Sequence, residues 1–196
     1  MKIHCGSGTV YLRDWCNVDL PTPKTFLAEE RPDLVEKYIT DEHDYYRRHK
    51  AKTVNSFRAG PITTEYIADR FGSFFNLPAR DGDADEFLAR QSFEHISLTE
   101  AHRALTEINR VLRDGGVLRL DVPDHEETLE KLRSTQDSFY ARHLMGPRSS
   151  EYGYHMLSYC RDTMKNLVQE HGFIFMLEES SPHLYPAFTL RFIKNG

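Results

Sequence analysis

The sequence is poor in cysteine, has a single tryptophan and contains no long apolar run. Cys5, Cys16 and Cys160 are too few and too irregularly spaced for a disulfide framework or a cysteine-based zinc site, so we expect a reduced, cytoplasmic protein without a metal. No stretch approaches the roughly 18 apolar residues of a membrane-spanning helix, and the first residues enter an apolar strand pattern directly. We therefore expect neither a membrane association nor a secretory leader.

An excess of positive charge is also missing, because 25 Lys and Arg stand against 30 Asp and Glu. A long polyanion would need such an excess, so the composition disfavours a nucleic-acid partner and favours a small-molecule substrate. With 196 residues and no internal repeat, the chain is long enough for one well-buried domain and too short for two of ordinary size. We expect a single domain over residues 1–196, and the sequence leaves its oligomeric state open.

What the sequence does contain is a glycine turn close to its start. Lys2 to His4 begin a short strand, and the Gly6-Ser7-Gly8 turn that follows lets a ligand approach the backbone closely. Asp19 ends a second short apolar run, where its carboxylate can accept hydrogen bonds from a ribose diol. Only 13 positions separate Gly6 from Asp19, against about 20 in a dinucleotide-binding unit, so a nicotinamide or flavin site is disfavoured. The turn and the acid predict half of a nucleoside site.

A second pattern lies far downstream, in residues 85–95 and 105–120. The first segment ends in Glu94-His95, and the second carries Arg-Val-Leu followed by a Gly-Gly pair and an apolar strand. Together they resemble the fourth strand, the following helix and the fifth strand of the class I S-adenosylmethionine-dependent methyltransferases. The early Cys-Gly-Ser-Gly, Leu-x-x-Trp and Asn-Val-Asp resemble a compact subgroup of that family, similar to the type 11 methyltransferases. The resemblance covers the chain except for residues 21–64.

This resemblance implies an α/β, Rossmann-like fold with a mostly parallel seven-stranded sheet, a C-terminal antiparallel hairpin and helices on both faces. The segment at about 21–64 is then a helical insertion. Within it, Pro32 to Ile39 has apolar residues at helical spacing, and we expect the helix to continue toward Lys50. The insertion is either a surface helix over the sheet edge or a mobile lid that closes over substrate.

The resemblance also implies S-adenosylmethionine as the cofactor. In the family an Asp four residues before a Leu-Pro commonly meets the adenine, but here that position is Ser73. Asp69, at the end of a third strand at about 65–69, takes this role across an insertion, which we favour, or else Ser73 and Phe74 lie against the adenine without a carboxylate. The cofactor-binding residues expected in all are His4, Cys5, Gly6, Ser7, Gly8, Asp19, Asp69, Ser73, Phe74, Arg90 and Gln91.

Three histidines are candidate catalytic residues because they fall in loops at the expected ligand edge of the sheet: His95, His125 and His155. A general base is needed only where the methyl acceptor must lose a proton. The polar, aromatic segment 138–154 is either a substrate contact or an ordinary surface loop. The Asn-Pro-Pro-Tyr motif of base and glutamine methyltransferases and the cysteine pair of carbon methylation in RNA are both missing.

The function that we expect is methyl transfer to a small polar acceptor, such as a sugar or a secondary metabolite. Two departures support an alternative, since His4 stands where the family usually has glycine and Lys2 where it has an acid. That alternative is a degenerate binding or scaffold subunit without activity. A second alternative is an RNA or protein methyltransferase.

Overall fold

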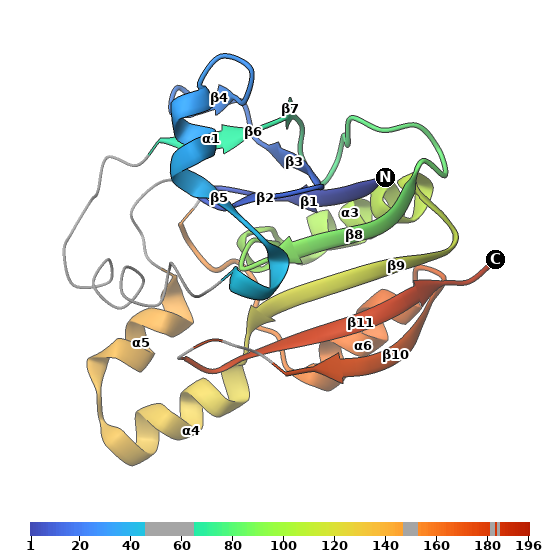
Figure 1. Cartoon of the computed structure of the whole chain (residues 1–196). Coiled ribbons are helices and arrows are strands. Elements are labelled where there is room, and N and C mark those ends of the chain that lie inside the picture. Colours follow the sequence, from blue (N-terminus) through green and yellow to red (C-terminus); the bar gives the residue numbers. More distant parts are fainter. Residues whose placement is uncertain (46–64, 147–152, 181–182, 184) are drawn as a thin grey trace.

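The computed structural model describes residues 1–45, 65–146, 153–180, 183 and 185–196. Its centre is a seven-stranded sheet in the order β10-β11-β9-β8-β1-β3-β7 (Figure 1). Neighbouring strands are parallel except where β11 pairs with β10 and β9, so the predicted C-terminal antiparallel hairpin is confirmed. The strands of this sheet are β1 (Lys2–Cys5), β3 (Cys16–Asp19), β7 (Arg70–Phe71), β8 (Ala84–Arg90), β9 (Leu112–Pro123), β10 (Phe173–Glu179) and β11 (Ala187–Lys194).

Strand β8 lies at the centre of the sheet and is buried on both faces. Phe87, Leu88 and Ala89 are consecutive and fully buried, which is typical of a parallel strand that is covered on both sides. Phe87 belongs to the main core cluster together with Leu118 and Leu120 of β9. Leu88 points the other way and belongs to a smaller cluster with Trp15 and Tyr45.

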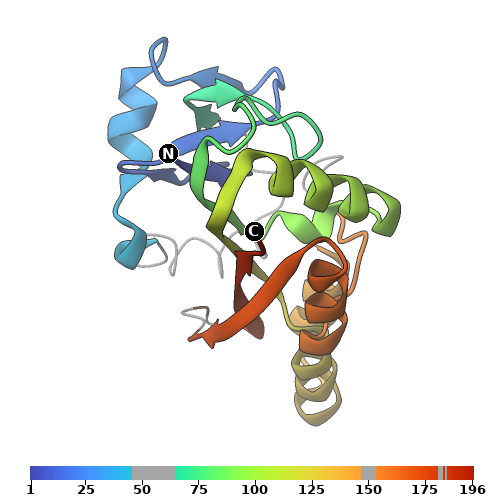
Figure 2. The ribbon, with the colours of Figure 1, turned by 90° about the vertical axis from the view of Figure 1, so that its right-hand side faces the viewer.

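Helices cover the two faces of the sheet unequally. Two of them, α3 (Leu98–Val111) and α6 (Arg161–Gln169), lie on one face, which we call the helical face (Figure 2). On the other side of the sheet lie α1 (Pro32–Tyr38) and the one-turn helix η1 (Glu42–Asp44). The second face, which we call the open face, carries the side chains of His4, Arg90, Arg119, Asp121 and Thr189, because alternate residues of paired strands point the same way.

Helix α3 buries one apolar stripe against the sheet, and its start is fixed by a capping box. The Ser97 hydroxyl accepts a hydrogen bond from the Glu100 amide at 3.4 Å, and the Glu100 carboxylate accepts one from the Ser97 amide at 2.8 Å. Each bond satisfies a backbone donor that the first helical turn would otherwise leave unpaired. Ser97 is therefore the N-cap of α3.

We expect Ser97→Ala to lower the free energy of unfolding by about 0.5–2 kcal/mol, because the first turn of α3 loses a hydrogen-bond acceptor. Urea denaturation measures this as a lower midpoint with an unchanged slope. Thr99→Ala is the matched control, since Thr99 is exposed in the same turn and caps nothing. Equal losses in the two variants would contradict the role of the cap.

The structure differs from the sequence-based expectation at two places, the glycine pair and the predicted third strand. Helix α3 ends at Val111, and Gly115 and Gly116 lie inside β9, where the pairing with β8 shifts register. Gly115 has φ of +69°, a conformation that suits a glycine at such a bulge. The segment Tyr66–Ala68, predicted as the third strand of the sheet, is β6 and pairs with β4 (Thr25–Leu27) in a separate two-stranded sheet.

The crossover between β1 and β3 contains no helix. It forms the two-residue strand β2 (Tyr11–Leu12), which pairs with β5 (Ile39–Thr40). Val10, Leu12 and Trp15 pack with Leu88 and thereby cover part of the open face. The compressed spacing seen in the sequence thus replaces a helix by a short strand and one tryptophan.

The first part of the insertion is packed against the rest of the domain. Leu34 and Tyr38 of α1 are buried with Ile67, so the apolar stripe predicted for this helix is correct. The expected continuation toward Lys50 is wrong as far as the structure describes it, because the chain leaves α1 at Tyr38 and enters β5. Residues 46–64 lie outside the described residues, and the lid stays a prediction.

The remaining helices follow β9. They are α4 (His125–Thr135) and α5 (Ser138–Met145). A further one-turn helix, η2 (Phe93–His95), lies earlier in the chain, after β8. The first half of the predicted polar loop 138–154 is therefore helical, and residues 147–152 lie outside the described residues. Among the helices that the structure describes, none is both long and apolar enough to cross a membrane.

Candidate active site

The glycine turn lies at the carboxyl end of β1, but its first two amides are used inside the protein. The amides of Gly6 and Ser7 both donate to the Val18 carbonyl, at 2.9 and 3.3 Å. A side chain on Gly6 would lie 2.6 Å from Ser92 Cβ, so this glycine permits the close approach of two loops. Gly8 differs, because among the described residues the nearest atom to a Cβ there would be a Tyr66 ring atom at 4.0 Å. The turn leaves room for a ligand at Gly8 and not at Gly6.

Asp19 lies directly beside this opening. Its Oδ2 accepts a hydrogen bond from the Gly8 amide at 2.6 Å, and its Oδ1 accepts one from the Leu20 amide at 2.8 Å. Burial raises the pKa of Asp19 above its usual range, although these amide bonds act in the opposite direction. A carboxylate oxygen has two lone pairs, so each oxygen retains an acceptor position. The predicted meeting of the glycine turn and Asp19 is therefore present.

Asp69 is not placed for the adenine role that the sequence analysis favoured. Its carboxylate accepts from the Asn17 amide at 2.7 Å and the Asn17 side chain at 3.1 Å, and it also pairs with the Tyr11 hydroxyl. It precedes β7 and pairs through its backbone with Asn17, upstream of the carboxyl edge. Ser73 lies two residues after the end of β7, with Phe74 next to it. Phe74 is largely buried and packs on Phe93 with ring centroids 5.5 Å apart.

His4 points away from the turn, into the open face. Its Nδ1 lies 3.0 Å from Asn17 Oδ1 and its Nε2 lies 3.2 Å from the Tyr45 hydroxyl. Burial, reinforced by the charge of Arg90, lowers the pKa of His4 to about 4. His4 was expected among the cofactor contacts, and the structure instead makes it a neutral, fully buried link between β1, β3 and Tyr45. Cys5, at the end of β1, is buried in the main core on the helical face.

The burial of His4 predicts a loss of stability in acid. The unfolded chain takes up a proton on this side chain near pH 6.5, whereas the folded chain does so only near pH 4, so stability falls as the pH drops between these values. At pH 5 the loss from this group is about 2 kcal/mol relative to pH 7, and most of it should vanish in His4→Gln. Urea midpoints at pH 7 and pH 5 measure the difference. His43→Gln is the control, because the His43 side chain is 78% exposed and should leave the pH dependence unchanged.

Arg90 and Gln91 end β8 at the carboxyl edge, as predicted. Gln91 has φ of +51°, a left-handed conformation that is uncommon outside glycine and is often found at functional sites. Its side-chain amide donates to Asp121 Oδ1 at 2.8 Å. Arg90 is buried, lies 3.6 Å from Glu42 and stacks over the Tyr45 ring at 4.7 Å. Both side chains are held by protein groups next to the turn.

The structure adds an acid–imidazole pair that the sequence analysis missed. Asp121 is fully buried at the end of β9 and accepts from His183 Nε2 and from the Thr189 hydroxyl, each at 2.8 Å. Burial alone would raise the pKa of Asp121, but the neighbouring His183 and its hydrogen bonds lower that pKa on balance. His183 lies in the connection between β10 and β11, 62 positions away, and no sequence pattern joins the two residues.

The three histidines predicted as catalytic do come together. The rings of His95 and His155 are 5.0 Å apart, and those of His125 and His155 are 6.2 Å apart. His125 accepts from the Tyr159 amide through Nδ1 at 3.2 Å, and burial lowers the pKa of all three imidazoles, that of His155 to about 3. Beside them Glu94 is 1% exposed, and burial raises its pKa to about 8.

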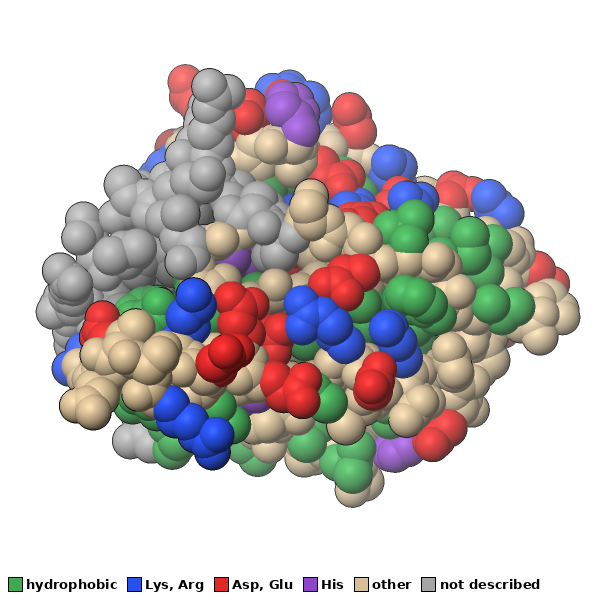
Figure 3. Space-filling view, turned by 90° about the horizontal axis from the view of Figure 1, so that it is seen from below, with side chains coloured by type: hydrophobic (Ala, Val, Ile, Leu, Met, Phe, Trp, Pro, Cys, Tyr) green, Lys and Arg blue, Asp and Glu red, His purple; other side chains and the backbone are tan. Residues whose placement is uncertain are grey.

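The open face carries a network of charges around Arg119. Its guanidinium pairs with Glu86, Glu179 and Glu42, and so ties η1 to β8, β9 and β10. An open cavity of about 440 Å³ lies here, lined by Glu42, His43, Arg90, Arg119, Glu179, Ser180 and Thr189. None of its lining residues belongs to the glycine turn. Figure 3 shows the molecule from below the view of Figure 1, and there the acidic and basic side chains of the described residues are interspersed.

Comparisons with known proteins agree with the fold. Residues 46–120, under half of the chain, match the family model for a methyltransferase domain. A methyltransferase structure from Methanosarcina mazei matches at 13% identity with a TM-score of 0.56, over 99% of this chain and 92% of the other. One from Clostridium acetobutylicum matches at 10% identity with a TM-score of 0.51, over 100% and 84%.

A third solved structure is the magnesium protoporphyrin IX methyltransferase of Synechocystis with bound SAH, the demethylated cofactor. It matches at 10% identity with a TM-score of 0.50, over 100% of this chain and 74% of the other. No curated relative matches the chain. At such identities the likenesses establish a shared fold.

Proposed function

We propose that this chain, which has the fold of the class I S-adenosylmethionine-dependent methyltransferases, transfers a methyl group from S-adenosylmethionine to a small polar acceptor. S-adenosylmethionine is the cofactor that this fold and the matched domain imply. The observation that carries the proposal is the meeting of Gly8 and Asp19. The Gly8 amide lies 2.6 Å from Oδ2 of the part-buried Asp19 carboxylate, and a remaining lone pair of this carboxylate could accept a ribose hydroxyl.

Different residues at the carboxyl edge of the sheet would contact different parts of the cofactor. Asp19 would hold the ribose, and Gln91, fixed by its bond to Asp121, would lie near the methionine portion. Ser73 and Phe74, which follow β7, would lie on the adenine side, without the carboxylate that the family commonly has there. The cofactor supplies an electrophilic methyl group, so the protein has mainly to orient the acceptor and exclude water.

His183 is the general base that the geometry supports best, for an acceptor that must lose a proton. Asp121 holds one ring nitrogen at 2.8 Å, which fixes the orientation of the imidazole. Such a pair typically contributes about 10²–10⁴ in rate. His95, His125 and His155 remain candidate acceptor contacts at the same edge of the sheet.

The surroundings of this pair support a small polar acceptor. Tyr185 packs on both His183 and His143, with ring centroids 4.5 and 4.7 Å apart. Imidazole and phenol groups of this kind donate and accept hydrogen bonds and present flat apolar faces, which suits a sugar or another compact polar metabolite. The mildly acidic composition, with 30 acids against 25 bases, lends no support to a nucleic-acid substrate.

One observation favours a second function, that of a scaffold without activity. The amides of Gly6 and Ser7 are already used by the Val18 carbonyl, and Ser73 offers no carboxylate to the adenine. A chain that had lost the cofactor would keep the fold and these internal bonds. Binding of the cofactor product separates the two functions.

Isothermal titration calorimetry with S-adenosylhomocysteine is the deciding experiment. We expect saturable binding with one site per chain and a rise in melting temperature. The absence of both heat and thermal shift at millimolar ligand would overturn the proposal and support the scaffold. Incubation with methyl-labelled cofactor and a fractionated metabolite extract would then place the label in a small molecule. Label in RNA or protein would overturn the acceptor class alone.

A further inference from the structure

Glu94 is the most unusual buried polar side chain in the described part of the molecule. It is 1% exposed, and neither of its carboxylate oxygens has a hydrogen-bond partner among the described residues. Leaving such a group unpaired costs about 1–3 kcal/mol, and more when it carries a charge. A carboxylate in this position therefore requires either a proton or a cation that the neighbouring side chains help to hold.

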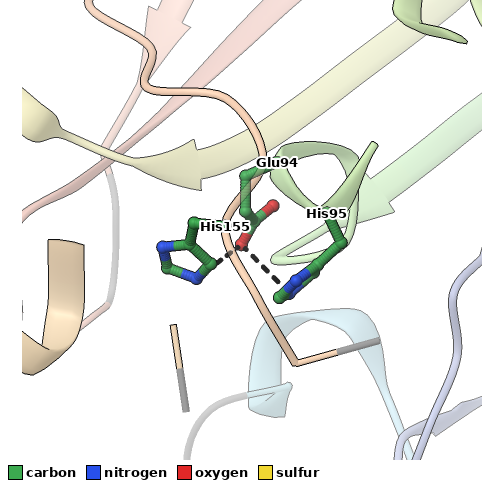
Figure 4. A group of neighbouring side chains, drawn as sticks. All are labelled: Glu94, His95 and His155. Atoms are coloured by element: carbon green, nitrogen blue, oxygen red, sulfur yellow. Dashed lines mark ion pairs between the residues drawn. The ribbon is translucent and has the colours of Figure 1, made fainter. Parts of the chain in front are cut away.

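Two imidazoles face the same carboxylate oxygen. His95 Nε2 and His155 Nε2 each lie 3.8 Å from Glu94 Oε1 (Figure 4). This separation is too long for a hydrogen bond but close to the spacing of ligands around one ion. Donor atoms bound tetrahedrally at about 2.0–2.2 Å lie about 3.3–3.6 Å apart, and the three donor atoms here all lie within 4.8 Å of one another.

The protein fixes the tautomer of His95 in the form that binds metals. His95 Nδ1 lies 2.8 Å from the Tyr154 carbonyl, which can only accept, so Nδ1 carries the proton and the lone pair of Nε2 points toward Glu94. Metal-binding histidines are commonly oriented in this way by a carbonyl on the other nitrogen.

The backbone brings the distant ligand, His155, to this place. The amides of Met156 and Leu157 both donate to the Glu94 carbonyl, at 2.8 and 3.2 Å, and the His155 amide donates to the Met145 carbonyl at 3.3 Å. The segment that carries His155 is thus bonded directly to the residue whose carboxylate it faces. The arrangement does not depend on a flexible surface side chain.

We propose that Glu94, His95 and His155 form a site for a zinc-type divalent ion, with a fourth position open to water or to an oxygen of the acceptor. One carboxylate and two imidazoles are a ligand set found in catalytic zinc sites. The ion would satisfy both the orphaned carboxylate and the two nitrogen lone pairs. The binding of the ion goes beyond the proposed function, and only its contact with an acceptor rests on that function.

The test is a calorimetric titration of chelator-treated protein with zinc chloride. We expect one equivalent of zinc to bind the wild type, and Glu94→Gln and His155→Ala to weaken this binding by at least about 10–100-fold. The absence of binding tighter than millimolar in the wild type would overturn the proposal. Cobalt chloride serves as a second probe, because the visible absorption of four-coordinate cobalt should appear and be displaced by zinc.

A second histidine pair provides a matched control. His102 Nδ1 lies 2.9 Å from His171 Nε2, and neither residue is one of the proposed ligands. His171→Ala should leave the zinc affinity unchanged. A loss of zinc binding in this variant, with binding retained in His155→Ala, would show that the ion binds the wrong pair and would overturn the proposal.

The variants must be folded for these comparisons, which circular dichroism and thermal unfolding establish. Should Glu94→Gln fail to fold, His95→Gln replaces it, because the His95 side chain is 20% exposed and tolerates substitution better. Zinc binding that is unchanged in a folded His95→Gln would contradict the site. Asp19→Asn separates this result from the proposed function, since it should weaken S-adenosylhomocysteine binding and keep zinc binding.

Discussion

Replacement of Arg119 by alanine should lower the free energy of unfolding by about 3 kcal/mol. The Arg119 side chain is 9% exposed and pairs with Glu179 at 2.7 Å, with Glu86 at 3.2 Å and with Glu42. Its removal leaves three partly covered carboxylates close together without their cation. We expect the lower end of the range for a broken buried pair, because Glu179 and Glu42 remain 22% and 29% exposed.

Arg113→Ala is the matched control for this variant. Arg113 belongs to the same strand, but it is 54% exposed and pairs with an exposed carboxylate, so its loss should cost less than about 1 kcal/mol. Urea denaturation measures both changes. Hydrogen exchange adds a local readout, since residues 42–44 should exchange faster in Arg119→Ala when Glu42 loses its partner. Similar losses in the two variants, with unchanged exchange at 42–44, would show that the network does not hold η1.

Much of the fold was predictable because its signals are local. The capping box at Ser97, the apolar stripe of α3 and the two final strands are short-range patterns, and all appear in the structure. The errors arise where pairing is decided by distant contacts. Tyr66–Ala68 has the composition of a central strand, yet it pairs with β4 in a separate sheet. The seventh strand of the main sheet is instead Arg70–Phe71.

In the candidate site, too, local patterns were predictable and distant contacts were not. The approach of Asp19 to the glycine turn was predictable, because both follow parallel neighbouring strands and must meet at one edge of the sheet. Asp69 could not be judged from its type alone. It is an acid close to the strand where the family's adenine-binding acid is expected. Its oxygens, however, accept hydrogen bonds from Asn17 and Tyr11, and no spacing rule in the sequence reveals such partners.

The residues that the sequence analysis missed are those joined only through tertiary structure. His183 meets Asp121 across 62 positions, and His155 meets Glu94 because backbone bonds from residues 156 and 157 reach the Glu94 carbonyl. Glu94-His95 itself was noticed as part of the family resemblance. What could not be read from the sequence was that the glutamate is buried without a hydrogen-bond partner, since burial depends on what covers the loop.

Asp19→Ala should weaken the binding of S-adenosylhomocysteine by roughly 1.5–3 kcal/mol, which is about 10- to 150-fold. The Asp19 carboxylate is positioned by the amides of Gly8 and Leu20 and keeps one acceptor position on each oxygen for a ribose diol. Asp19→Asn separates charge and acceptor capacity from shape. It should lose some stability, because the Gly8 or the Leu20 amide loses its acceptor. The folded protein should still bind weakly, because an amide presents only one oxygen to the two hydroxyl donors.

Asp69→Asn and Ser73→Ala decide the remaining question of the adenine side in the same titration. We expect Asp69→Asn to lower stability, because Asn17 and Tyr11 lose an acceptor, while the affinity of the folded protein for S-adenosylhomocysteine stays within about twofold. Ser73 follows β7 at the carboxyl edge, so Ser73→Ala should weaken binding by up to about tenfold if its hydroxyl meets the ligand. A large loss of affinity in Asp69→Asn, with none in Asp19→Ala, would mean that the nucleoside binds at Asp69 and not beside Asp19. The site built around Gly8 would then be incorrect.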